Sequence, residues 1–222
     1  MLARDVPAEL LGAPRGEVRS ASALAELAGV SSASVSRILK ALEADDYLVR
    51  GAHELRLVRI EALLQAWRRS AQRPLEQWLV RPSLPGGDPL DHVHSALARR
   101  ARSHASPVGP EGARMCLGHF AASRALGLGF VRGAPLHLYC EAPLPALFEQ
   151  LDLVAVEHPK EAEWIVVRPA FPESVFRGCV ERNGVPVADA LQCWIDVSFH
   201  AARGEEQASE IAARIWSERW SH

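Results

Sequence analysis

Long apolar runs, closely spaced cysteines and lysine are all scarce in this chain of 222 residues. No run of about 18 apolar residues is present, so we expect no membrane-spanning helix. The four cysteines form no Cys-x-x-Cys pair, which argues against a disulfide framework. The opening residues, MLARDVPAELLG, lack the apolar segment of a secretion signal. These features together predict a cytoplasmic protein.

The overall charge is also small, because 25 basic and 27 acidic residues leave a formal net charge of -2. An evenly basic surface is therefore excluded, and any nucleic-acid face must be local. The sequence contains no Gly-x-Ser-x-Gly, no Gly-x-x-x-x-Gly-Lys-Ser/Thr and no His-Glu-x-x-His motif. We therefore predict a binding protein, with no enzymatic activity, no cofactor and no metal site.

Two stretches rich in proline and glycine divide the chain. They are RPSLPGGDP, from Arg81 to Pro89, and SHASPVGPEG, from Ser103 to Gly112. We predict a winged helix-turn-helix domain over residues 1–80, a linker with a bridging helix over 81–112, and an α+β domain over 113–222. The fold class is thus α+β, with an N-terminal winged helix-turn-helix domain and a mixed C-terminal domain.

The N-terminal part alternates helices with one hairpin. A helix over residues 22–28 ends at Gly29, and Ser31 or Ser32 can cap the next helix. In that second helix Val35, Ile38, Leu39 and Leu42 form the spacing of a buried stripe. Short strands over 47–50 and 54–58 enclose a turn, and a further helix follows over 59–72. This order is typical of a winged helix-turn-helix.

The second helix can present a polar face to the major groove of DNA. Its small first residues allow a close approach, and the wing adds basic side chains. Between Ser31 and Arg73 there are eight basic and five acidic residues, a local charge of +3. The predicted DNA contacts are Ser32, Ala33, Ser34, Ser36, Arg37, Lys40, Arg50, His53 and Arg56. The alternative is a helical domain that only packs or dimerises.

The C-terminal part alternates strands and helices. Asn183-Gly184 is a strong hairpin signal within residues 179–188. The other predicted strands cover residues 136–141, 153–157 and 164–168. The predicted helices cover residues 143–151, 189–199 and 204–216.

These segments resemble the AbiEi-like antitoxins of type IV toxin–antitoxin systems. The likeness rests on GVSSASVSRILKALEADDYLVR, on GARMCLGHFAASRAL, on PLHLYCEAPLPALFEQLDL, and on the Asp-x-x-Gln-x-x-x-Asp and Arg-Gly-x-Glu runs near the C-terminus. The resemblance implies an autorepressor that binds double-stranded operator DNA. It also implies a C-terminal domain that counters a nucleotidyltransferase toxin. The candidate partner-binding residues are Asp189, Gln192, Asp196 and Arg203.

Other interpretations of the C-terminal residues stay open. Asp189 can cap a helix, while Gln192 and Asp196 can bond the backbone or Arg203. The same side chains could instead bind a metal, which would make the domain a nuclease or nucleotidyl-processing enzyme steered by the winged domain. A third alternative is a protein-interaction module. A regulator needs two half-sites, bound by a homodimer or by cooperating monomers, and the sequence does not choose between these.

Overall fold

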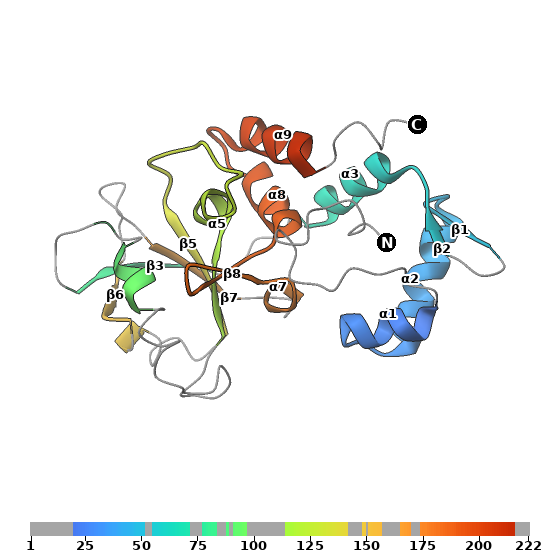
Figure 1. The fold of residues 1–222 in the computed structure, drawn as a ribbon, viewed down its shortest axis with the longest axis horizontal. Helices are drawn as coiled ribbons and strands as arrows, with labels where there is room; N and C mark the ends of the chain where they lie inside the picture. Colours follow the sequence, from blue (N-terminus) through green and yellow to red (C-terminus); the bar gives the residue numbers. More distant parts are fainter. Residues whose placement is uncertain are drawn as a thin grey trace. The chain divides into compact units, whose positions relative to one another are not determined.

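The computed structural model describes residues 20–51, 55–71, 77–83, 88, 91–96, 114–141, 148–149, 151–156, 165–169 and 174–215, leaving out the side chains of 165–169 and 174. The structure forms two compact units, and the chain passes from the first to the second between Arg73 and Pro74. Within the described ranges, none of the helices is long and apolar enough to cross a membrane. Helices and strands are both present, so the α+β class is confirmed (Figure 1).

The first unit begins with two helices joined by a tight turn. Helix α1 (Ala21–Ala28) starts at Ser20, whose hydroxyl accepts a hydrogen bond from the Ala23 amide. Gly29 ends it with a φ of 61°, a left-handed conformation that glycine adopts without steric cost. Helix α2 (Ser32–Ala44) starts after Ser31. The glycine turn therefore sets the direction in which α2 leaves α1.

A small antiparallel hairpin follows, made of β1 (Leu48–Arg50) and β2 (Leu55–Leu57). Helix α3 (Ile60–Ala71) is the last described element before the chain enters the second unit, and Ile215 also belongs to the first unit. One apolar cluster joins α1, α2 and the hairpin. Its buried members are Ala25, Val35, Leu39, Leu48 and Leu55. The hairpin is thus fixed to the inner side of α2 by packing rather than by chain connectivity alone.

The predicted buried stripe of α2 is wrong at one position. Val35 and Leu39 are buried and Leu42 is half-buried, but Ile38 is 56% exposed. Positions 35, 39 and 42 follow the i, i+4, i+7 spacing of one helix face, whereas position 38 lies at its edge. The two-helix contact covers only the centre of that face.

The second unit is built on a seven-stranded mixed sheet in the order β6-β3-β7-β5-β4-β9-β8. Its strands are β3 (Trp78–Pro82), β4 (Met115–Gly118), β5 (Leu136–Cys140), β6 (Leu153–Ala155), β7 (Ile165–Pro169), β8 (Val180–Arg182) and β9 (Val185–Val187). Strand β5 is central, pairing antiparallel with β4 and parallel with β7. Both pairings bring together segments that are far apart in the sequence, so the sheet depends on long-range contacts.

Helices α5 (His119–Ala125) and α8 (Ala190–Ser198) pack on each other and against β4 (Figure 1). The short helix α7 (Ser174–Arg177) precedes β8, and α9 (Gly204–Ile215) follows α8. The predicted hairpin is confirmed, because Asn183 and Gly184 have φ values of 53° and 76° between β8 and β9. Predicted strands near 136–141, 153–157 and 164–168 are confirmed as β5, β6 and β7.

Two features differ from the sequence-based expectation. The N-terminal segment of the first unit ends at Arg73 rather than at residue 80, since β3 pairs with β6 and β7 in the second unit. Strand β3 also continues through Arg81 and Pro82, where a linker was expected. Residues 91–96 are helical, in the expected bridging region. Of the predicted helix over 143–151, residues 148–149 are helical and residue 151 lies in a turn, while 143–147 and 150 lie outside the described residues.

Candidate nucleic-acid interface

The start of α2 is organised by hydroxyl groups. The Ser31 hydroxyl accepts a hydrogen bond from the Ser34 amide at 3.1 Å, and the two hydroxyls lie 2.9 Å apart. The Arg37 guanidinium in turn donates to the Ser34 hydroxyl at 3.3 Å. These contacts hold the Arg37 guanidinium near the positive end of the helix dipole. The guanidinium and the dipole both favour an approaching anion.

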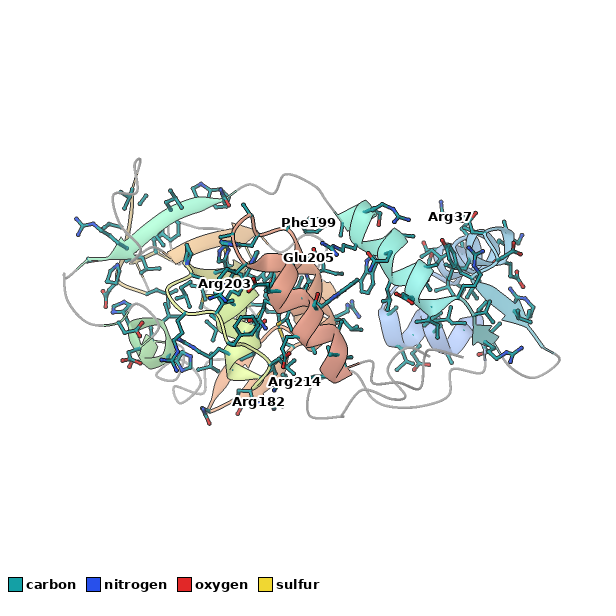
Figure 2. The ribbon with its side chains drawn as sticks, turned by 90° about the horizontal axis from the view of Figure 1, so that it is seen from above. Arg37, Arg182, Phe199, Arg203, Glu205 and Arg214 are labelled. Carbon is teal, nitrogen blue, oxygen red and sulfur yellow. The ribbon has the colours of Figure 1, made fainter. Side chains whose placement is uncertain are left out.

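The exposed side of α2 carries mostly small side chains. Ala33, Arg37, Lys40 and Ala44 recur at helical spacing and are all exposed. Figure 2 labels Arg37 among them. Ser32 and Ser36 are exposed as well, while Ser34 is half-buried by its part in the cap. A face made of alanines and serines around two cations can lie close to a duplex and still reach its phosphates.

The two arginines expected in the wing lie on opposite faces of the hairpin. In the β1–β2 register Arg50 pairs with Leu55, whose side chain is buried, whereas Arg56 pairs with Val49, which is exposed. Because side chains alternate along a strand, Arg50 faces α2 and Arg56 faces away from it. The third candidate, His53, lies outside the described residues.

Arg50 is held by a carboxylate that the sequence did not single out. Its Nε lies 2.8 Å from Oε1 of Glu43, and its Nη2 lies 3.1 Å from Oε2. The hydrogen bonds from Arg50 hold the pKa of the Glu43 carboxyl below its usual value, with Lys40 adding a weaker attraction. Seven residues separate this pair across a helix–strand turn, so no local spacing rule could reveal it. We call Glu43 and Arg50 the Glu43–Arg50 pair.

In the second unit, Asp196 and Gln192 belong to a buried polar network. The Tyr139 hydroxyl donates to Oδ1 of Asp196 at 2.7 Å, and the Gln192 amide donates to the same oxygen at 2.8 Å. Asp196 is a buried residue of α8, and its hydrogen-bond partners include Tyr139 of β5 rather than Arg203. Tyr139 is thus a residue that sequence spacing did not indicate.

Asp189 caps α8, as one of the sequence interpretations proposed. Its Oδ1 accepts a hydrogen bond from the backbone N–H of Gln192 at 2.8 Å. Burial raises the pKa of the Asp189 carboxyl to about 6, although hydrogen bonds from the helix backbone oppose that shift. A capping role accounts for the position of this side chain without a ligand.

Arg203 lies apart from this network, at the surface before α9 (Figure 2). It forms an ion pair with Glu206 at 3.0 Å, and its guanidinium stands 5.5 Å from the centre of the Phe130 ring. The four candidate partner-binding residues are therefore divided among a helix cap, a buried network and an exposed ion pair. They do not converge on one surface site.

Two stacked histidines lie beside the buried network. The rings of His119 and His137 are 3.9 Å apart between centroids, and both side chains are buried. His119 has a φ of 53° at the junction of β4 and α5, where its amide lies 3.4 Å from Oδ2 of Asp196. Within the described ranges, no three His, Cys, Asp or Glu side chains are arranged to hold a metal ion. Burial favours a packing role for this pair.

Comparison with family models, with curated proteins and with solved structures found no match for the chain.

Proposed function

We propose that the protein is a sequence-specific, double-stranded DNA-binding transcriptional regulator. In this proposal the first unit acts as a winged helix-turn-helix, with α2 in the major groove and the β1–β2 hairpin as its wing. The observation that carries the proposal is the exposed, small-residue face of α2, on which Arg37 and Lys40 project beside a serine-capped helix start.

The electrostatics of the first unit support the same role. The chain has a net charge of -2, yet the region around α2 and the hairpin carries a local charge of +3, from eight basic and five acidic residues between Ser31 and Arg73. A local basic surface on an acidic chain favours docking in one orientation. The resemblance to AbiEi-like antitoxins supports an autorepressor in particular. Two half-sites would be bound by a dimer or by cooperating monomers.

The salt dependence of DNA binding tests this proposal. Each phosphate contact contributes about 0.9 to the slope of log K against log salt concentration. We expect Arg37→Ala to weaken binding and to reduce the slope by about 0.9, and Lys40→Ala to do the same. Arg177→Ala, which removes an exposed arginine of the second unit, is the matched control. An unchanged slope in both α2 variants, measured by fluorescence titration, would reject the assignment.

A further inference from the structure

The Glu43–Arg50 pair lies at the edge of the face that we propose to bind DNA. Ser36, Lys40 and Glu43 follow one another at i, i+4 and i+7, so they share one side of α2. The Glu43 side chain is 31% exposed and that of Arg50 is 47% exposed. A carboxylate at this position is close enough to Lys40 for an electrostatic attraction between the two charges. A docked duplex would therefore bring phosphates near a negative side chain.

The geometry of the pair determines what Arg50 can do. Two parallel N–H···O contacts, at 2.8 and 3.1 Å, match the planar fork of the guanidinium to both carboxylate oxygens. Moving Arg50 to a phosphate would break both contacts and leave Glu43 as an uncompensated charge facing the DNA backbone. Arg56 does not share this constraint, since it lies on the other face of the hairpin. The two wing arginines therefore have different roles.

We propose that the Glu43–Arg50 pair stays intact on DNA, so that Arg50 is a positioning residue and not a phosphate contact. This inference rests on the proposed DNA-binding function. Arg50 neutralises Glu43 and fixes the hairpin against α2, while the phosphate contacts come from Arg37 and Lys40. Glu43 in turn limits the affinity of the surface, because it keeps one cation away from the duplex.

A phosphate-interference experiment on the full-length chain distinguishes the two roles of Arg50. The probe is a duplex enriched from a random pool by the wild type, with single phosphates replaced by neutral methylphosphonates. We expect Arg50→Ala to bind about five to ten times more weakly at 0.1 M salt, the effect of one unit charge. The set of sensitive phosphates should remain that of the wild type.

The double variant E43Q/R50A completes the test. Removing both charges should restore affinity to within about twofold of the wild type, with the same sensitive phosphates. If Arg50 contacts DNA, one phosphate disappears from the sensitive set of Arg50→Ala and stays absent in the double variant, which overturns the inference. Wild-type affinity in Arg50→Ala also overturns it, because the neutralising role then has no effect.

Two controls separate folding and general charge effects from the proposed role. The variant E26Q/R50A has the same net charge as E43Q/R50A, but its neutralised carboxylate is on the exposed side of α1, so it should bind as weakly as Arg50→Ala. Circular dichroism of each variant checks that the unit is folded. If the wild type enriches no duplex at all, the proposed function fails and the inference with it. If the wild type binds but one phosphate depends on Arg50, only the inference fails.

Discussion

The cap of α8 predicts a stability that depends on pH in a defined direction. The pKa of Asp189 is about 6 in the folded protein, against an ordinary value of 3.8. The folded state binds the proton of this carboxyl more tightly than the unfolded state does. The contribution of Asp189 to the free energy of unfolding is therefore fully present below pH 4 and is lost as pH rises through 6. The difference between these two pKa values corresponds to at most about 3 kcal/mol in the free energy of unfolding.

Asp189→Asn removes the ionisation and keeps a capping side chain. We expect the stability of the variant relative to the wild type to rise between pH 4 and pH 8, by up to about 3 kcal/mol. The assay is the denaturant dependence of hydrogen exchange in peptides that cover α8. Asp45→Asn, which removes an exposed carboxylate of the first unit, reports the effect of the charge change itself. A constant difference in stability between Asp189→Asn and wild type across this pH range would show that folding does not raise the pKa of Asp189.

Two further predictions concern buried hydrogen bonds. Gln207 is fully buried and bonds three backbone groups in residues 128–131, so Gln207→Leu should destabilise the second unit by about 2–5 kcal/mol in urea titrations. A loss below about 1 kcal/mol would contradict this. Tyr139→Phe removes a donor from the buried Asp196 carboxylate and should cost about 1–3 kcal/mol. An equal stability of Tyr139→Phe and wild type would show that this bond contributes nothing.

Local signals in the sequence were sufficient for most of the described elements. The serine cap of α2, the turn at Gly29 and the Asn183-Gly184 hairpin are each encoded by adjacent residues, and all three are present. Asp189 as the cap of α8 follows from the same kind of local rule. Capping and turn chemistry act over a few residues, so they can be inferred without knowing the tertiary fold.

Features that depend on distant residues could not be predicted in this way. Strand β3 was missed because its proline and its neighbouring glycines are typical of a linker, while its pairing partners β6 and β7 lie more than 60 residues away. Ile38 fits a helical stripe by spacing, yet the packing of α1 leaves it exposed. Asp196 accepts a hydrogen bond from Tyr139, which lies 57 residues earlier in the sequence.

The candidate site likewise has one part that local sequence predicts and one part that depends on tertiary contacts. The small, basic face of α2 could be read from helical periodicity, because exposure there follows from position on the helix. The Glu43–Arg50 pair could not, since it joins a helix to a strand through the register of the hairpin. The sequence named Arg50 and Arg56 together as wing contacts, and the structure places one against a carboxylate and the other on the opposite face of the hairpin.

The most direct test of the account is selection of duplexes from a random pool by the full-length protein, followed by competition with unrelated DNA. A regulator that places α2 in the major groove should enrich one common sequence and bind it at least about a thousandfold more tightly than unrelated duplex at physiological salt. Equal affinity for enriched and unrelated duplex, or no retention of DNA at that salt concentration, would contradict the account.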